Sequence, residues 1–255
     1  MQNIVYKSDG IIKWLDGYRD KWEDFYPSER WAFQKFSDER GTLGRILDVG
    51  CAMGGLALAL AGRFDVKEYV GVDINRAAID RALGQNQPRF TVPAKFFCED
   101  ILKVKDFRDV PFDVVVSLSC ADWNIETDKI IWRCWEAVKK GGVFVMSVRL
   151  TPGEGVNDIT RSHQPIAVGQ DGAVIETANY VVFNVQDLLR RFENLSPRPS
   201  KVAGYGYWGK PSANAVTPYA RLVFGVFVVE KSLKGDKPIE SELNFPSDLF
   251  TITKK

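Results

Sequence analysis

Apolar runs alternate with amphipathic segments through the middle of the chain. Residues 45–50, 68–73, 94–100, 112–118 and 143–150 form the apolar runs, and the segments between them carry apolar residues at helical spacing. Asn75 is a typical helix-start residue, and a predicted helix from about Asn124 to Lys139 ends at a Lys-Lys-Gly-Gly turn. This alternation predicts an α/β fold in which helices cover both faces of a parallel sheet.

The pattern differs on either side of this central region. Before it, residues 9–40 carry aromatic residues at helical spacing, followed by a helical segment from Ser28 through Phe36. We expect residues 1–43 to form an N-terminal helical lid that packs against the sheet or covers the ligand pocket. Residues 151–175 are rich in Gly, Pro, Asp and Asn, and a connection of that length in an α/β domain usually serves a site.

The last third of the chain returns to regular elements. Residues 177–185 are expected to be extended, 186–195 helical, and 220–231 to form the last strong strand. We therefore predict one domain over residues 44–231, with the 151–175 insertion as a substrate loop and residues 232–255 as a surface tail.

Composition excludes several classes of protein. Lys and Arg total 34 against 33 for Asp and Glu, which gives no general basic face for nucleic acid and makes that partner unlikely. No apolar stretch is long enough for a membrane span and the first residues do not resemble a signal peptide, so we expect a cytoplasmic protein with no membrane partner. The four cysteines lack CxxC spacing and there is one histidine, so no metal site is expected.

Acidic residues follow three successive predicted strands. Asp48 comes just before the small-residue sequence Gly50 to Gly55, Asp73 ends the second strand, and Glu99 and Asp100 end the third. Because parallel strands end at one edge of a sheet, these carboxylates are expected to face one crevice. Asp73 is placed to accept hydrogen bonds from ribose hydroxyls, and Asp100 to reach an adenine amino group.

The glycine spacing argues against a dinucleotide. A pyrophosphate site requires G-x-G-x-x-G, whereas the glycines here stand at 50, 54 and 55 with Asp48 before them. A carboxylate repels a diphosphate but attracts an amino group and a sulfonium.

With these motifs, residues 44 to 150 resemble the class I, Rossmann-fold S-adenosylmethionine-dependent methyltransferases. The resemblance implies a Rossmann-like, mostly parallel sheet of seven strands, and S-adenosylmethionine as the cofactor with S-adenosylhomocysteine as its product. It implies cofactor contacts from the first motif, the ribose acid, the adenine contact and the position after the fourth strand: Asp48, Gly50, Cys51, Ala52, Gly54, Asp73, Ile74, Asp100, Ile101 and Ser119. Ala52 departs from the family pattern, since glycine is common at that position.

The methyl acceptor is expected at the carboxyl ends of the fourth and fifth strands. Asp122 is a candidate to orient or deprotonate the nucleophile, with helix capping as its alternative role, and His163 is the natural base for an alcohol acceptor. The candidate substrate-binding residues are Tyr18, Trp22, Arg30, Trp123, Asn124, Arg149 and Arg161.

The acceptor itself has several possible identities. We favour a small molecule, with methylation at a hydroxyl of a sugar or related metabolite. A natural-product or cofactor-precursor O- or N-methyltransferase is an alternative, as are an RNA methyltransferase and a non-catalytic cofactor-binding subunit. The sequence does not indicate an oligomeric state.

Overall fold

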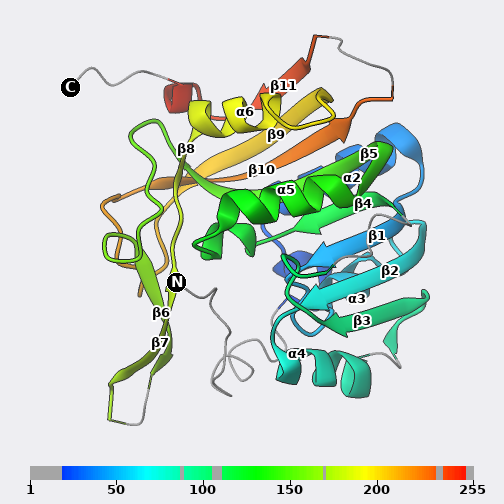
Figure 1. The fold of residues 1–255 in the computed structure, drawn as a ribbon, viewed down its shortest axis with the longest axis horizontal. Helices are drawn as coiled ribbons and strands as arrows, with labels where there is room; N and C mark the ends of the chain where they lie inside the picture. The colour runs from blue at the N-terminus through cyan, green and yellow to red at the C-terminus, as the bar shows by residue number, and fades with distance from the viewer. Residues whose placement is uncertain (1–18, 87–88, 105–110, 169–170, 234–237, 251–255) are drawn as a thin grey trace.

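The computed structural model describes residues 19–86, 89–104, 111–168, 171–233 and 238–250. Its centre is a mixed sheet in which the strands lie side by side in the order β11-β9-β10-β5-β4-β1-β2-β3 (Figure 1). Their bounds in chain order are β1 Gly44–Val49, β2 Val66–Asp73, β3 Ala94–Cys98, β4 Phe112–Ser117, β5 Val138–Thr151, β9 Pro199–Gly209, β10 Leu222–Lys231 and β11 Glu240–Asn244. A short strand, β8 (Phe183–Asn184), pairs with the end of β5.

The predicted parallel arrangement is confirmed for the first five strands. β1 pairs in parallel with β2 and β4, β2 with β3, and β4 with β5, whereas β10 runs antiparallel to both β5 and β9. The order reverses between β1 and β4, which is the place where open α/β sheets bind ligands at their carboxyl edge.

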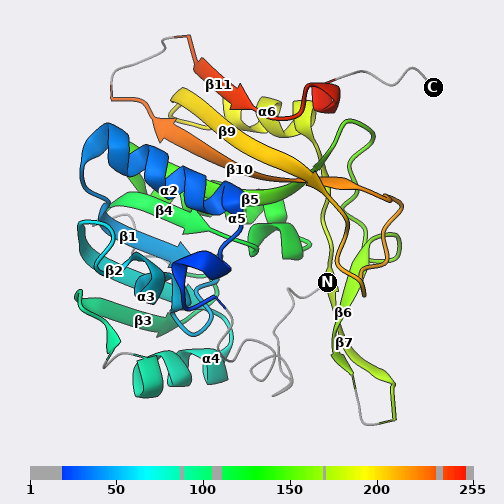
Figure 2. The ribbon, with the colours of Figure 1, turned by 180° about the vertical axis from the view of Figure 1, so that it is seen from behind.

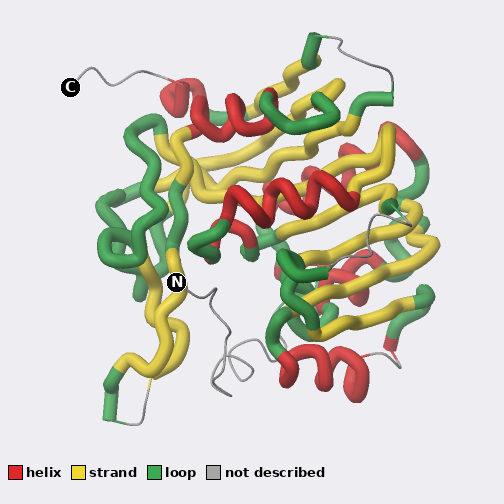
Figure 3. Tube along the Cα trace, in the orientation of Figure 1, coloured by secondary structure: helices red, strands yellow, loops and turns green. Residues whose placement is uncertain are grey.

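Helices cover both faces of this sheet (Figure 3). Helices α2 (Pro27–Arg40) and α3 (Gly55–Leu60) lie on one face (Figure 2), and α5 (Thr127–Ala137) and α6 (Val185–Glu193) lie on the other. Helix α4 (Arg76–Arg81), continued by a π-helical segment over Ala82–Asn86, packs beside β2 and β3. None of the described helices is long and apolar enough to span a membrane.

The sheet separates two hydrophobic cores. Val114, Val116, Val143 and Val145 face α2 and α3, whereas Val115, Phe144 and Met146 face α5 and α6. Successive side chains of a strand point to opposite faces, so strands buried on both sides must be apolar at every position. This explains why the sequence shows continuous apolar runs here and not alternation.

The predicted substrate loop is a structured insertion. Strands β6 (His163–Val168) and β7 (Val174–Asn179) form a hairpin outside the main sheet, beyond the end at which the parallel strands finish (Figure 1). Two isolated bridges, Val156 to Val182 and His163 to Val216, anchor its base.

Several predicted boundaries were wrong. Helix α2 extends beyond the predicted range at both ends, and α5 begins at Thr127 and not at Asn124. The amide of Asn124 donates to the carbonyl of Cys120 (2.9 Å), which closes a separate 3-10 turn, Ala121–Trp123, before the helix. The leading aromatic helix of the predicted lid lies mostly outside the described residues, and the described part forms only a 3-10 turn at Trp22–Asp24.

The expected surface tail adds a strand to the sheet. Strand β11 pairs in parallel with β9, and Phe245 then packs over Gly204 and Gly206, where an added Cβ would lie 2.5 and 2.8 Å from its ring. Glycine weakens strand propensity, so the alternating glycine and aromatic residues of β9 give only a weak strand signal in the sequence. In the structure these glycines make room for Phe245.

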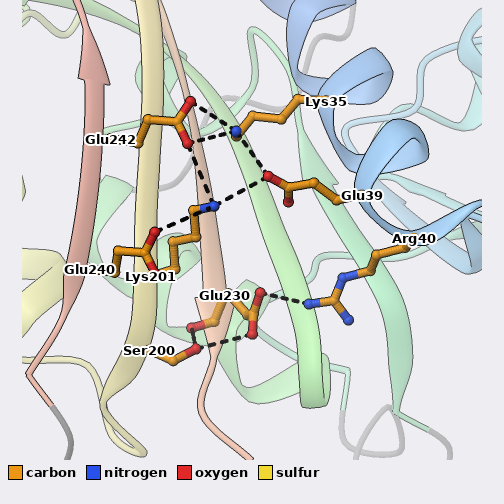
Figure 4. A network of polar contacts seen from close by, with 8 residues as sticks. All are labelled: Lys35, Glu39, Arg40, Ser200, Lys201, Glu230, Glu240 and Glu242. Carbon is orange, nitrogen blue, oxygen red and sulfur yellow. Dashed lines mark hydrogen bonds and ion pairs between the residues drawn. The ribbon is translucent and has the colours of Figure 1, made fainter.

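An ion-pair network fastens α2 across this far edge of the sheet (Figure 4). Lys35 contacts Glu242 of β11 (2.7 Å), Lys201 of β9 contacts Glu39 (3.2 Å), and Arg40 contacts Glu230 of β10 (2.6 Å). These side chains are partly exposed, so each pair contributes little to the stability. Together the contacts fix where α2 lies relative to β9, β10 and β11.

A buried lysine closes the end of α5. The ammonium group of Lys231, whose residue is 5% exposed, donates to the carbonyls of Trp135 (2.6 Å) and Val138 (2.7 Å). The last carbonyls of a helix have no partner within the helix, and a cation there is favourable. Lys231 therefore joins the last residue of β10 to the end of α5.

Replacing this lysine tests its structural role. Lys231→Met keeps the aliphatic stem but removes the two hydrogen bonds to the carbonyls of Trp135 and Val138, so the free energy of unfolding should fall by about 1–3 kcal/mol. Chemical denaturation measures this change. The control Glu240→Gln, in a side chain that is 73% exposed, should alter the stability by less than about 0.5 kcal/mol. Equal effects of the two substitutions would contradict the role of Lys231.

Candidate functional site

The acidic residues predicted to share a crevice lie at adjoining strand ends. In the sheet register Asp48 of β1 pairs with Gly71 of β2, and Asp73 at the end of β2 pairs with Cys98 of β3. The polypeptide turns sharply after each of these strands. The structure thus brings the predicted carboxylates to one edge of the sheet.

Asp73 organises two of these turns. One carboxylate oxygen accepts the backbone N–H of Ala52 (2.9 Å) in the loop after β1, and the other accepts that of Asn75 (2.8 Å). The Asn75 side chain in turn accepts the N–H of Ala78 (3.0 Å) and caps α4. Asp73 therefore fixes the first loop relative to the second while keeping carboxylate lone pairs for a ligand.

The loop after β1 requires unusual backbone angles. Gly50, Ala52 and Gly54 have φ values of +80°, +47° and +78°. A positive φ strains a residue that carries a Cβ, such as Ala52. This explains why glycine is common at this position in the family that the sequence resembles. The hydrogen bond from Ala52 N–H to Asp73 is the contact that holds this conformation.

Gly50 allows the loop to meet the segment after β4. A Cβ at Gly50 would lie 2.5 Å from the sulfur of Cys120, so no larger residue fits without displacing that segment. The close approach places the cofactor loop directly against the region where the methyl acceptor is expected. Gly50 is therefore required for the packing of this loop against Cys120.

Asp48 is buried beneath this loop. It is 4% exposed and accepts a hydrogen bond from the hydroxyl of Tyr69 on β2. Burial raises the pKa of Asp48 to about 7; the bond from Tyr69 opposes the rise and the charge of Asp73 adds to it. Asp48 is thus poised to change its protonation state near neutral pH.

The end of β3 carries the remaining cofactor candidates. One oxygen of Asp100 accepts the N–H of Leu102 (3.0 Å), and the other lies 3.5 Å from the ammonium of Lys103. Ile101 is buried in the core on the α5 face, whereas Ile74, after β2, is partly buried. Asp100 remains partly exposed at the sheet edge, where a ligand can reach it.

On the acceptor side, Ser119 joins three parts of the chain. Its N–H donates to the hydroxyl of Ser147 on β5 (2.8 Å), and its own hydroxyl accepts a bond from the guanidinium of Arg19 (3.2 Å). Arg19 also forms an ion pair with Glu29 near the start of α2. The N-terminal segment is thereby connected to the carboxyl ends of β4 and β5.

Asp122 and Arg149 form a buried ion pair. Their oxygen and nitrogen are 2.8 Å apart, and both side chains are about 95% buried. The guanidinium of Arg149 lies 3.6 Å from the ring centre of Tyr180 and 4.4 Å from that of Trp123. One oxygen of Asp122 and the Nε of Arg149 are buried without a hydrogen-bond partner.

His163 lies at the start of β6, where its backbone pairs with Val216. Its Nδ1 atom is buried and has no hydrogen-bond partner. Three residues further on, Ile166 packs against Met53 of the loop after β1 and Ala78 of α4. The β6-β7 hairpin therefore contacts both the loop after β1 and helix α4.

The other predicted substrate residues are not all brought to this region. Trp22 packs against Phe33 and Phe64 on the α3 face, with ring centres 6.3 and 5.2 Å apart. Arg161 is exposed, Arg30 is partly exposed on α2, and Tyr18 lies outside the described residues.

Sequence reasoning missed four residues of the site. Three of them contact a residue that was predicted: Arg19 contacts Ser119, Tyr69 contacts Asp48, and Tyr180 contacts Arg149. The fourth, Glu29, pairs with Arg19. Only Tyr69 left a signal in the sequence, as an aromatic residue within the aliphatic run of β2. In the described part of the chain, no cluster of His, Cys, Asp and Glu could hold a metal ion.

Comparison with known proteins agrees with this geometry. Residues 46–142 match the model of a family described as a methyltransferase domain. The segment covers β1 to the start of β5, and so it contains Asp48, Asp73, Asp100 and the turn after β4.

Two curated proteins are similar over segments of about the same length. The chain is 30% identical to phosphoethanolamine N-methyltransferase 2 of Caenorhabditis elegans over 103 residues, which cover 40% of this chain and 23% of that protein. It is 27% identical to trans-aconitate 2-methyltransferase of Deinococcus radiodurans over 104 residues, which cover 41% and 37%. The chain thus spans about a quarter to a third of the length of these curated relatives.

The fold is shared over a longer span. An S-adenosylmethionine-dependent methyltransferase from Clostridium acetobutylicum superposes with a TM-score of 0.55 at 13% identity, over 87% of this chain and 98% of that one. Residues 46–142 thus match a methyltransferase domain, and the fold around them is that of the S-adenosylmethionine-dependent methyltransferase from Clostridium acetobutylicum.

Proposed function

We propose that this protein transfers the methyl group of S-adenosylmethionine to a hydroxyl or amino group of a small molecule. The observation that supports this most is the set of carboxylates at adjoining strand ends, where Asp73 joins the loop after β1 to the turn after β2. A cationic, adenosine-containing cofactor is complementary to such a crevice.

Each cofactor candidate has a role in this proposal. Asp73 accepts hydrogen bonds from the ribose hydroxyls, Asp48 holds the amino group of the methionine part, and Asp100 with Ile101 contacts the adenine. The backbone of Gly50 to Gly54 lies along the cofactor, and Ser119 lies between the cofactor and the acceptor. The bound cofactor supplies an electrophilic methyl group on a sulfonium.

The acceptor side of the proposal rests on the turn after β4 and on the hairpin. Asp122, Trp123, Asn124 and Arg149 line the turn, and His163 stands at the base of the hairpin. The chief contribution of these residues is to hold the acceptor in line with the methyl carbon and the leaving sulfur. The proposed acceptor is a small molecule that presents a hydroxyl group, as a sugar or related metabolite does, or an amino group.

Labelled cofactor tests the activity directly. The purified protein is incubated with methyl-labelled S-adenosylmethionine and fractionated cell extract, and the label is followed by chromatography and mass spectrometry. Label in a small-molecule fraction would support the proposal. Label only in RNA or in protein would contradict the acceptor class, and cofactor binding without any transfer would indicate a non-catalytic subunit.

The role of Asp73 predicts a loss of cofactor affinity. Asp73→Asn removes the charge and one of the hydrogen-bond acceptors, so the Kd for S-adenosylmethionine should rise roughly 10- to 100-fold. Isothermal titration calorimetry measures the Kd. Asp80→Asn, on the exposed surface of α4, is the matched control and should leave the Kd unchanged. Unchanged affinity in the Asp73 variant would remove the ribose assignment.

The raised pKa of Asp48 predicts pH-dependent binding. In the cofactor-free protein the proton on Asp48 stabilises the fold, and this contribution is lost as pH rises through about 7. The ammonium group of the cofactor requires the ionised carboxylate, so binding releases a proton below that pH. Affinity should therefore fall by up to about tenfold per pH unit below pH 7.

Calorimetry between pH 5.5 and 7.5, in buffers of different ionisation enthalpy, measures both the affinity and the released proton. Asp48→Asn should bind the cofactor weakly and without this pH dependence. A wild-type affinity that is flat across the range would contradict the contact between Asp48 and the ammonium group.

A further inference from the structure

Glu29 is a buried carboxylate with an unused oxygen. It is 0% exposed, near the start of α2, and its Oε2 accepts the N–H of Tyr26 (3.0 Å) and pairs with Arg19. Its Oε1 is buried and has no hydrogen-bond partner. An unsatisfied buried carboxylate oxygen is costly, and so it indicates a hydrogen-bond donor that arrives with a ligand.

The contacts of Arg19 place Glu29 beside the acceptor side of the site. The same guanidinium that pairs with Glu29 donates to Ser119 (3.2 Å), and Ser119 in turn donates to Ser147 (2.8 Å). Glu29 therefore stands one side chain away from the carboxyl ends of β4 and β5. Burial raises the pKa of Asp48, of Asp122 and of Tyr207 on β9, and the charge of Glu29 adds to each rise, which agrees with a position near these three groups.

The charges around Glu29 select the acceptor. Glu29 is paired with Arg19 and Asp122 with Arg149, so these four charges cancel. The carboxyl of Asp48 is bonded to a tyrosine hydroxyl, and that of Asp73 to backbone N–H groups. The proposed cofactor contacts engage Asp48 and Asp73, so the unpartnered Oε1 of Glu29 is left for the acceptor, and it favours a hydrogen-bond donor over a carboxylate or phosphate near the reacting atom.

We propose that Glu29 binds the nitrogen of an amine acceptor through Oε1, and that the protein is an N-methyltransferase of a small primary or secondary amine. This inference rests on the methyltransferase function proposed above. Oε1 can accept a hydrogen bond from an amine N–H and so orient the nitrogen. A neutral amine attacks through its lone pair without first losing a proton, whereas an alcohol must lose its proton during the attack.

The reaction at this site balances as follows. The lone pair of the amine nitrogen forms the new C–N bond while the C–S bond breaks, and its electron pair stays on sulfur, which becomes a neutral thioether. The methylated nitrogen is then a cation that stays hydrogen-bonded to Oε1 of Glu29, and its proton passes to water when the product leaves. Glu29 thus positions the nitrogen, and the reaction does not require His163 as a base.

Paired variants test this assignment. The acceptor pool is the small-molecule fraction of cell extract, methyl-labelled S-adenosylmethionine is the probe, and calorimetry gives the cofactor affinity of each variant. Glu29→Gln keeps the shape of the side chain and should lower the initial rate of methyl transfer roughly tenfold or more, with the cofactor Kd unchanged. Glu193→Gln, at the exposed end of α6, is the control, and His163→Ala should reduce the rate less than Glu29→Gln does.

The linkage of the label in the wild-type product gives a second measurement that requires no variant to fold. An N-methyl product supports the inference, and a methyl ester or methyl ether overturns it. An unchanged rate in Glu29→Gln, or an equal loss of rate and of cofactor affinity, also overturns it while the methyltransferase function stands. Absence of transfer by the wild-type protein removes the proposed function and the inference together.

Discussion

The carboxylate of Asp73 is the contact on which the cofactor side of this structure depends. Its two oxygens accept N–H groups from Ala52 and Asn75, and so it joins the loop after β1 to the turn after β2. Ala52 holds a positive φ, and this hydrogen bond offsets the strain of that conformation. Asp73 is thus both a proposed ligand contact and the residue that shapes the loop.

The acceptor side depends on a second set of contacts, which come from parts of the chain far apart in sequence. Gly50 lets Cys120 approach the cofactor loop, and Ser119 connects β5 to Arg19. Arg19 and Glu29 precede the matched methyltransferase segment, whereas Arg149 and Tyr180 follow it. In the proposed function, the matched segment therefore supplies the cofactor contacts and the flanking segments supply the groups that would choose the acceptor.

The sequence predicted where the strand-end carboxylates lie better than it predicted the contacts of Arg19 and Glu29, for a physical reason. Asp48, Asp73 and Asp100 follow apolar runs directly, and strand ends in a parallel sheet must share an edge, so local pattern was enough to place them. Glu29 pairs with Arg19 and adjoins Ser119 only through tertiary packing, and no spacing in the sequence records such a contact. In the same way, the glycines of β9 concealed a strand whose partner, Phe245, lies some forty residues further on.

Strand β11 changes the nature of the sheet's outer edge. Without it, the eleven-residue β9 would offer a long row of unpaired backbone groups, which is a template for pairing with another molecule. β11 covers that row with a five-residue strand that carries Glu240 and Glu242, and their carboxylates contact Lys201 and Lys35. A short, charged edge is a poor partner for a further strand. Strand β11 therefore protects this edge of the sheet from pairing with another molecule, and so from aggregation. A chain that ended after β10 would lose this protection while keeping every residue of the proposed site.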